Sequence, residues 1–363
     1  MRNGESAEAG MVEETRAAIA LGASFLATIV VVPVMKQVAL AIGLVDLPSS
    51  RKVHQRPMPY LGGLAISFGT VAALMAVAGL TAPSRWLVLG AVGVGTIGLL
   101  DDHRSLSPKL RLGGEFVFAG MVAWSGTRLA VTGDTVIDAG ISAFVLVALT
   151  NALNLCDNMD GLAAGLCAAG ASAVLIVAAR NGNAEMAVVA ATLVGALLGF
   201  LAFNAPPAAI FMGDCGSLFL GFMLAGLGMS VAEGTRGTHG GLLVALTCAV
   251  LVLDTCTVVV ARKRSGRKIT DAGKDHLSHR LVACGLSRPQ AVGTLVLVAC
   301  ATAFAGGAVA AGVVPPFAGA VLALGCVLPI AVVCWTATVY PSPDTTEVVA
   351  GSEMAKLPIA VGE

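Results

Sequence analysis

Acidic side chains stand at the ends of several apolar segments in a chain that is otherwise poor in charge. The segment GLLDDHRSLSPKLRL places Asp101 and Asp102 side by side where a predicted helix ends. A helix C-terminus carries partial negative charge, so two carboxylates there are unfavourable unless they bind a cation or serve chemistry. A solvated acidic helix end is the simpler alternative. Because Lys109 and Arg111 follow closely, the segment suits a metal or phosphate site.

Amides and carboxylates recur at helical spacing in NALNLCDNMDGLAAG. Asn151, Asn154 and Asp157 are three residues apart, which on a helix places them along one face. Asp160 then precedes the glycine that begins the next apolar segment. Such groups are costly to desolvate and rare in membrane helices without a function. A polar cap with an Asx turn would explain either aspartate but not the asparagines, so we favour a functional site.

A third acidic turn, FMGDCGS, lies between a helix that ends at two prolines and the helix that follows. Free backbone N–H groups at such a helix start favour anions, and Asp214 offers a hard oxygen ligand for Mg²⁺. Gly-Asp-x-Gly-Ser is also an ordinary N-cap. We therefore interpret this turn as part of a functional site only because it is predicted to lie at the same membrane face as the other acidic segments.

Two basic segments are predicted to lie at the same membrane face as the acidic segments. The first is VDLPSSRKVHQRPMPYLGG, which contains Arg51, Lys52 and His54. The second is RKRSGRKITDAGKDHLSHRL, which contains His276, His279 and Arg280. Histidine beside arginine is a combination that binds phosphate oxygens. Dense positive charge is equally typical of cytoplasmic loops and of attraction to anionic lipid.

Two further acids, Glu115 and Asp254, fall inside apolar segments. Acids within a membrane span face the bundle interior by default. Asp254 lies about two helical turns before Arg262. It is either a structural partner of that helix end or part of the site, and the sequence leaves both open.

The elements that must position these side chains are long and apolar. The 363 residues are 56% hydrophobic and 12% charged, about half the charged fraction of a soluble domain. A transmembrane helix needs about 20 apolar residues, and the candidate segments are 17–43, 61–80, 86–100, 112–131, 136–156, 161–179, 184–203, 216–232, 241–261, 290–312 and 317–340. The third is short and the fourth contains Glu115. We therefore expect an all-α polytopic integral membrane protein with about eleven transmembrane helices, or ten.

The positions of Lys and Arg predict the orientation, because cytoplasmic loops carry the excess. One alternating set of loops holds most of them and the other set holds single residues. We expect an extracytoplasmic tail over 1–16, a transmembrane domain over 17–340 with a cytoplasmic-facing cleft in the inner (plasma) membrane, and a disordered cytoplasmic tail over 341–363. Acidic and basic residues number 22 each. A nucleic-acid binder would need a basic surplus on one face, so that class is excluded.

Taken together, five segments resemble in order and spacing the polyprenyl-phosphate N-acetylhexosamine-1-phosphate transferases, membrane enzymes that prime cell-envelope polysaccharide synthesis. The segments are DLPSSRKVHQRPMPYLGG, LLDDHRSLSPK, NALNLCDNMDGLAAG, FMGDCGSL and HLSHR. The resemblance covers about residues 17–340. It implies a bilayer-embedded fold, Mg²⁺ or Mn²⁺ as cofactor, and transfer of a sugar 1-phosphate from a UDP-sugar to undecaprenyl or decaprenyl phosphate with release of UMP. The sequence leaves open whether the chain forms a homodimer.

The resemblance also implies roles for individual residues. Asp101 and Asp102 match adjacent catalytic aspartates, one of which orients or deprotonates the lipid phosphate, and Asp157 matches a further catalytic acid. Asp214 matches the Mg²⁺ ligand, with Asn154 near that metal. Phe211 matches the aromatic residue that stacks on uracil, and Asp160 matches a position that recognises the base. His276, His279 and Arg280 match the loop that closes over the sugar and pyrophosphate. From their positions in the same segments, and not from the resemblance, we also expect the following residues to bind substrate: Asn151, Lys109, Arg51, Lys52 and His54.

The donor sugar is inferred from the first and last loops. DLPSSRKVH and DHLSHRL resemble the N-acetylglucosamine branch, and the alternative is the branch that uses UDP-N-acetylmuramoyl-pentapeptide or another UDP-N-acetylhexosamine. Asn158-Met159 replaces a common Gly-Leu and Glu115 replaces a common Gln. A remote alternative is a multi-pass transporter with Asp254 and Glu115 on an ion path, which would place the acids near the middle of the membrane.

Overall fold

The computed structural model describes residues 2–46, 57–77, 79–233, 239–271 and 273–336, with side chains from residue 11 onward. Within these ranges the chain forms thirteen helices and one pair of short antiparallel strands. The helices are α1 Arg2–Ile42, α2 Gly62–Val77, α3 Ala82–Arg104, α4 Pro108–Trp124, α5 Thr135–Cys156, α6 Leu162–Arg180, α7 Ala184–Asn204, α8 Gly213–Glu233, α9 His239–Thr247, α10 Ala249–Arg264, α11 Leu277–Ala283, α12 Arg288–Ala310 and α13 Pro316–Thr336. The strands are β1 Val45–Asp46 and β2 Met58–Pro59. The all-α prediction is confirmed.

Eight of the described helices are long and apolar enough to cross a membrane, and α9 with α10 makes a ninth if this pair, bent by 61°, is one span. The predicted count of ten or eleven also needs α2 and α4. These helices have 16 and 17 residues, fewer than the roughly 20 that span a bilayer. Every predicted span contains a helix, and the chain is a multi-pass α-helical membrane protein. Helix α1 starts earlier than the predicted span, because residues 2–16 are helical too.

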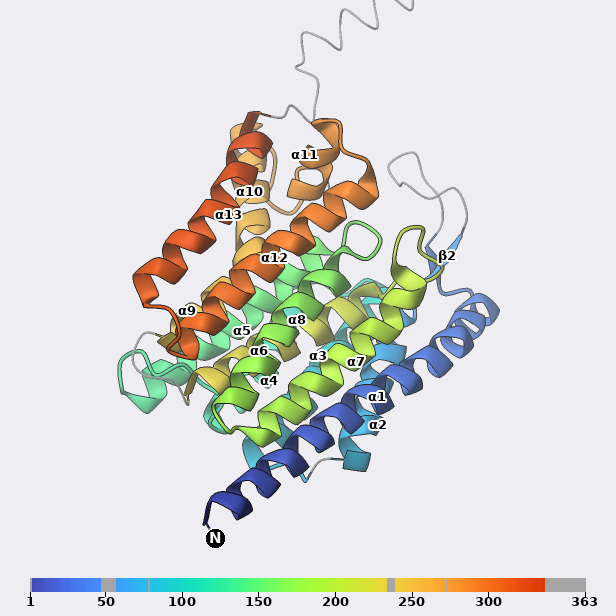
Figure 1. Ribbon diagram of the computed structural model, residues 1–363. Helices are drawn as coiled ribbons and strands as arrows, with labels where there is room; N and C mark the ends of the chain where they lie inside the picture. Colours follow the sequence, from blue (N-terminus) through green and yellow to red (C-terminus); the bar gives the residue numbers. More distant parts are fainter. Residues whose placement is uncertain (1, 47–56, 78, 234–238, 272, 337–363) are drawn as a thin grey trace, which may run out of the picture.

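Helix α8 occupies the middle of the bundle. It packs against α2, α3, α5, α6 and α9, as Figure 1 shows, and 94% of its most apolar window is buried. A helix that is apolar on all sides is expected in such a place. The corresponding fractions for α1 and α13 are 22% and 17%. Those two helices cover the outside of the bundle and expose apolar side chains, as lipid-facing helices do.

Glycines bring the first turn of α8 very close to its neighbours. A Cβ added to Gly63 of α2 would lie 2.2 Å from the backbone nitrogen of Gly216, and one added to Gly98 of α3 would lie 2.3 Å from the carbonyl oxygen of Asp214. Only glycine permits backbones to approach this closely. Gly213, which begins α8, has a positive φ of 71°. Together these glycines fix where the acidic turn of α8 lies relative to α2 and α3.

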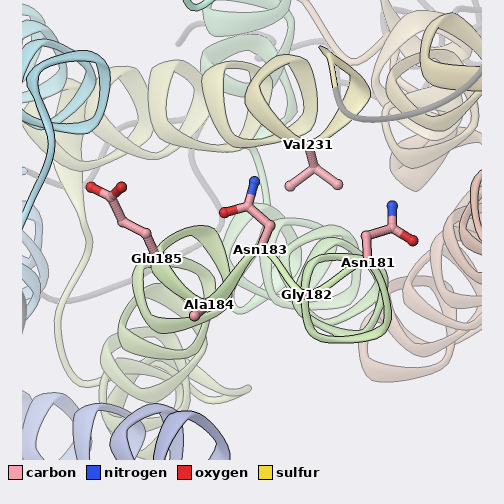
Figure 2. Close-up of a pocket in the computed structure, with 6 residues that line it drawn as sticks. All are labelled: Asn181, Gly182, Asn183, Ala184, Glu185 and Val231. Atoms are coloured by element: carbon pink, nitrogen blue, oxygen red, sulfur yellow. The ribbon is translucent and has the colours of Figure 1, made fainter. Parts of the chain in front are cut away.

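The two ends of the bundle differ in chemistry. At the end near the N-terminus of α1, the turn between α6 and α7 borders a shallow cavity of about 410 Å³ lined by Asn181, Gly182, Asn183, Ala184, Glu185 and Val231 (Figure 2). The predicted acidic residues lie where α6 and α8 begin, at the opposite ends of these helices. Helices of about 20 residues are about 30 Å long, so this cavity is remote from the acidic residues.

Candidate active site

The acidic segments predicted to act together meet at one end of the bundle. Asp101 and Asp102 lie in the last turn of α3, Asn154 lies in the last turn of α5, and Asp214 lies in the first turn of α8. Asp157 is the C-cap residue of α5. Three helices that are distant in sequence therefore bring their oxygen-bearing side chains to the same place.

Arg111 of α4 joins these side chains. Its Nη1 lies 3.0 Å from Asp101 Oδ2 and 3.1 Å from Asp214 Oδ2. Its Nη2 donates to the side-chain oxygens of Asn151 and Asn154 at 3.2 and 3.5 Å. One guanidinium thus contacts α3, α5 and α8. The sequence places Arg111 beside a predicted metal or phosphate site but assigns it no individual role, because positive charge at a helix start is equally typical of a cytoplasmic loop.

Glu115 holds the other side of this guanidinium. It lies one turn after Arg111 on α4, is fully buried, and places Oε1 3.5 Å from Arg111 Nε. Asn151 Nδ2 donates a hydrogen bond to Glu115 Oε2. A buried carboxylate is tolerated when it is paired with a cation and hydrogen-bonded. Asn151 is therefore within the predicted site, where its contacts orient Arg111 and Glu115.

The adjacent aspartates of α3 have different partners. Asp101 faces Arg111 and also accepts a hydrogen bond from the backbone N–H of Leu106 at 2.6 Å. Asp102 accepts from the backbone N–H groups of Asp214 and Cys215 at 2.9 and 3.1 Å. It therefore caps the N-terminus of α8, where a carboxylate is favoured by the free N–H groups and the helix dipole.

Negative charge exceeds positive charge in this cluster. The pKa of Asp157 is raised to about 7, first by burial and then by the charges of Asp214, Asp102 and Asp160. A carboxylate resists ionisation when nearby carboxylates lack enough cations to balance them. Arg111 is the cation that contacts Asp101 and Asp214 directly. The site therefore has a negative potential that a divalent cation would neutralise.

The donor set fits Mg²⁺ chemically. Asp214 accepts a hydrogen bond from Asn154 Nδ2 at 2.8 Å, and the same amide group donates to Ser217 Oγ, so Asp214 is oriented by its neighbours. Among the described residues no three His, Cys, Asp or Glu side chains converge as a preformed metal centre. Mg²⁺ commonly uses only one or two protein carboxylates and keeps several waters. Asp214 with the nearby side-chain oxygens satisfies that requirement.

Asp160 and Phe211 belong to the segment that enters α8. Asp160 Oδ2 accepts from the backbone N–H of Ala208 at 2.9 Å, and Phe211 pairs through its backbone with Pro59 and Gly62. Asn204, which was not predicted, accepts from Gly161 N–H and donates to the carbonyl of Ile210. The predicted pair lies near the acidic turn, and Asn204 is a conventional buried amide that no sequence motif distinguishes.

The histidine segment is attached to the same end through Asp254. Nδ1 of His276 lies 2.8 Å from Asp254 Oδ2, and the backbone N–H of Leu277 donates to Oδ1 at 2.7 Å. The thiol of Cys156, at the end of α5, lies 3.4 Å from the same carboxylate. The sequence leaves two roles open for Asp254. In the structure its carboxylate pairs with His276 at the start of α11 and lies beside the end of α5.

Ser278 makes a second link between α11 and α5. Its hydroxyl donates to the side-chain oxygen of Asn158 at 2.6 Å, and Asn158 is next to Asp157 in the chain. His279 is partly buried, and its pKa is lowered to about 4 by burial, then by the charges of His276 and Lys274. The imidazole of His279 is therefore neutral at pH 7. The structure brings both predicted histidines close to the C-terminal end of α5.

Arg280 has contacts on a different side of α11. Its Nε donates to the backbone carbonyl of Asp275 at 2.8 Å, and its Nη1 donates to the carbonyl of Cys334 in α13 at 2.9 Å. These bonds hold α11 against α13. Lys109 is exposed in the first turn of α4. Arg51, Lys52 and His54 lie outside the described residues.

The fold and the site define a class: a multi-pass helical membrane protein with an acid-rich polar site where α3, α5 and α8 meet. The chain belongs to glycosyl transferase family 4, whose sequence profile matches residues 84–232. That range contains Asp101, Asp157 and Asp214 and the helices that carry them. The sequence-based resemblance is thereby confirmed at the level of the family.

Several relatives resemble this chain over most of their length. The "Probable undecaprenyl-phosphate N-acetylglucosaminyl 1-phosphate transferase" of Bacillus subtilis is 33% identical over 78% of this chain and 82% of its own. A "Decaprenyl-phosphate N-acetylglucosaminephosphotransferase" of Mycobacterium tuberculosis is 34% identical over 78% and 80%. The "Phospho-N-acetylmuramoyl-pentapeptide-transferase" of Geobacillus kaustophilus is 33% identical over 73% and 89%.

Proposed function

We propose that this protein transfers N-acetylglucosamine 1-phosphate from UDP-N-acetylglucosamine to undecaprenyl or decaprenyl phosphate, releasing UMP and initiating cell-envelope polysaccharide synthesis. The single observation that carries the proposal is the convergence of Asp101, Asn154 and Asp214 around Arg111. The names of the Bacillus and Mycobacterium relatives support the substrates. UDP-N-acetylmuramoyl-pentapeptide is the alternative donor, in keeping with the Geobacillus relative.

The buried acids argue against the transporter alternative. An ion path needs ionisable groups that can take up and release their ion. Glu115 is paired with Arg111, and Asp254 is paired with His276 and the backbone of Leu277. Both acids therefore serve the same end of the bundle as the motif aspartates, which supports a site for chemistry.

Asp214 and Asn154 would hold the Mg²⁺ cofactor, with Mn²⁺ as a substitute. A bound divalent cation supplies charge neutralisation for the diphosphate and for the departing UMP. The protein's own residues must orient two anions that repel each other, because phosphoryl transfer is limited by charge and positioning. Arg111 is placed to contact phosphate oxygens through its two Nη groups, which match phosphate geometry.

The nucleophile is an oxygen of the lipid phosphate. It attacks the phosphorus that carries the sugar, the bond from that phosphorus to the bridging oxygen breaks, and UMP leaves with the bridging oxygen. A phosphate monoester has a second pKa of about 6, so at neutral pH it is mostly dianionic and needs little help from a base. Asp101 therefore acts mainly in orientation. A covalent aspartyl intermediate is the alternative route.

This end of the bundle would face the cytoplasm at the inner membrane. The basic residues of α4 and of the segment between α10 and α12 lie at the end that carries the acids, and cytoplasmic faces carry such an excess. In Figure 1 the N-terminus lies at the bottom and α11 at the top. An extracytoplasmic N-terminus agrees with this arrangement.

The test is a reaction with purified protein, undecaprenyl phosphate and Mg²⁺. Three donors are compared: UDP-N-acetylglucosamine, UDP-N-acetylgalactosamine and UDP-N-acetylmuramoyl-pentapeptide. We expect UMP and a lipid-linked sugar 1-phosphate, detected by mass spectrometry, with the first donor. Asp214→Asn should remove the Mg²⁺-dependent product. Full activity of that variant, or product from the pentapeptide donor alone, would contradict the corresponding part of the proposal.

A further inference from the structure

The positively charged guanidinium of Arg111 lies where a divalent cation is expected to bind. Its Nη1 lies within 3.1 Å of carboxylate oxygens from both Asp101 and Asp214, and Asp214 is the residue expected to bind the cation. A Mg²⁺ ion lies only about 2.1 Å from its ligand oxygens. An ion bound to Asp214 Oδ2 would therefore come close to Nη1, and two cations at that distance repel each other strongly.

We propose that Arg111 is an internal counter-ion that competes with the divalent cation and turns to the diphosphate when the cation binds. The inference rests on the proposed function for the identity of the diphosphate. Before substrate binds, the guanidinium balances Asp101 and Asp214. When the cation binds, Nη1 leaves these carboxylates and Nη2 leaves the side-chain oxygens of Asn151 and Asn154, so that both groups become available to phosphate oxygens.

Glu115 gives this movement a pivot. Its carboxylate is fully buried and lies 3.5 Å from Nε, the guanidinium nitrogen nearest the helix. Asn151 holds Glu115 in turn through a hydrogen bond. Since this contact is on the Nε side, the two Nη groups can turn while the side chain stays in the site. Arg111 is therefore a positioning and phosphate-binding residue whose orientation depends on the cation.

The arrangement predicts that the cation and the nucleotide sugar bind cooperatively. A cation alone must displace Arg111 with no new partner for the guanidinium. When a diphosphate is present, the displaced guanidinium gains phosphate oxygens, which it can bind in bidentate fashion. Each ligand should strengthen the binding of the other by the same factor.

The test measures binding rather than turnover, so that it remains separate from the proposed function. Mn²⁺ is titrated into detergent-purified protein without substrate, and free Mn²⁺ is followed by electron paramagnetic resonance. Arg111→Gln should bind Mn²⁺ at least about tenfold more tightly than the original chain, because the competing charge is gone. Adding Asp214→Asn to that variant should abolish the gain. Unchanged or weaker Mn²⁺ binding by Arg111→Gln would overturn the proposal.

Arg104 provides a matched control for Arg111. Arg104→Gln removes the same charge from an exposed position at the end of α3 and should leave Mn²⁺ affinity within about twofold, since exposed charges are screened. Arg111→Gln should bind UDP-N-acetylglucosamine at least about tenfold more weakly, the opposite sign to its Mn²⁺ effect. General damage to the fold would weaken the binding of both Mn²⁺ and UDP-N-acetylglucosamine. If Arg111→Gln does not purify as a folded protein, Arg111→Lys should bind Mn²⁺ more tightly than the original chain, and affinity no greater than that of the original chain would contradict the proposal.

Discussion

Asp102 shows how one residue connects the predicted chemistry to the stability of a helix. Its carboxylate accepts from two backbone N–H groups at the start of α8. Loss of an N-cap side chain costs about 1–2 kcal/mol. We expect Asp102→Ala to lower the free energy of unfolding by that amount and to lower activity strongly, because the turn that carries Asp214 loses its anchor. Thermal unfolding in detergent and UMP release measure the two effects.

Asp134 provides a matched control for that prediction. It caps the start of α5 through the backbone N–H groups of Val136 and Ile137, at the end of that helix away from the acids. Asp134→Ala should cost similar stability and leave the turnover of the folded protein unchanged. Equal loss of turnover in both variants would show that the effect of Asp102 is not local.

His279 makes stability depend on pH in a direction that can be calculated. In the unfolded chain a histidine binds a proton near pH 6.5, whereas burial and the charges of His276 and Lys274 lower the folded pKa to about 4. Between these values the unfolded state binds more protons, so acidification favours unfolding. We expect His279→Gln to reduce the fall in melting temperature between pH 7 and pH 5. His103→Gln, at an exposed position, should keep the original fall, and an identical fall in both variants would refute the assignment.

For individual residues, the sequence predicted which acids belong to the site but not which side chains they contact. Asp101, Asn154, Asp157 and Asp214 could be found because oxygen-bearing side chains at the ends of apolar helices are costly without a function. Arg111, the common partner of Asp101, Asn154 and Asp214, is 103 positions away from Asp214, and nothing local shows which cation these side chains share. The same limit applies to Asp254, whose role depends on a histidine in another helix.

The contact between α3 and α8 supplies a prediction at the scale of elements. A Cβ on Gly98 would lie 2.3 Å from the carbonyl oxygen of Asp214, so one helix must move. Overpacking of this kind costs about 1–3 kcal/mol or more. We expect Gly98→Ala to lower both the melting temperature and the Mn²⁺ affinity, because the displaced atoms belong to the acidic turn.

Gly113 of α4 is the matched control for Gly98. No atom lies within 4 Å of the position its Cβ would take. Replacing an unconstrained helical glycine by alanine stabilises a helix by up to about 1 kcal/mol. Gly113→Ala should therefore keep or raise the melting temperature and leave Mn²⁺ binding unchanged. A normal melting temperature and Mn²⁺ affinity in Gly98→Ala would mean that the helices adjust more easily than their backbone contact suggests.

The segment between α10 and α11 depends on a buried ion pair. Asp275 is 1% exposed and pairs with Arg262, which is 4% exposed, at 3.3 Å, and also with Arg267. Removing one partner of a buried pair leaves an uncompensated charge and costs about 3–5 kcal/mol. We expect Asp275→Asn to unfold or detach this segment, seen as rapid proteolysis between α10 and α12. The double variant Arg262→Met with Asp275→Leu should recover much of the loss, and failure of the single variant to destabilise would contradict the argument.

Periodicity and length predicted most of the elements, and packing determined the rest. All eleven predicted spans contain helices, because apolar runs of this length have few other structures in a membrane. The sequence does not indicate the bend between α9 and α10, because the residues around Cys248 are apolar on both sides of the break. Helix α11 lies in a segment predicted as a basic loop, and its attachment to α5 depends on tertiary contacts.

The candidate active site lies at one end of the helical bundle, here called the chemical end, and the contacts at the opposite end mainly hold loops together. The chemical end contains the acids, α11 and the strand pair. The other end contains the cavity of Figure 2 and bonds that tie loops together, such as that from Thr81 N–H to Glu185. An enzyme that joins a cytoplasmic nucleotide sugar to a membrane lipid needs only one such face, so the orientation of the bundle is the property that tests the whole arrangement.

Native cysteines allow that orientation to be measured. Cys284, at the C-terminal end of α11, is exposed outside the spanning helices, whereas exposed Cys256 lies within α10. A maleimide that cannot cross membranes should label Cys284 only after spheroplasts are permeabilised, because positive-inside loops face the cytoplasm. In a Cys284→Ser background, Asn181→Cys at the opposite end should be labelled in intact spheroplasts. The reverse pattern would place the acidic site outside the cell, where UDP-sugars are absent, and would contradict the proposed function as well as the orientation.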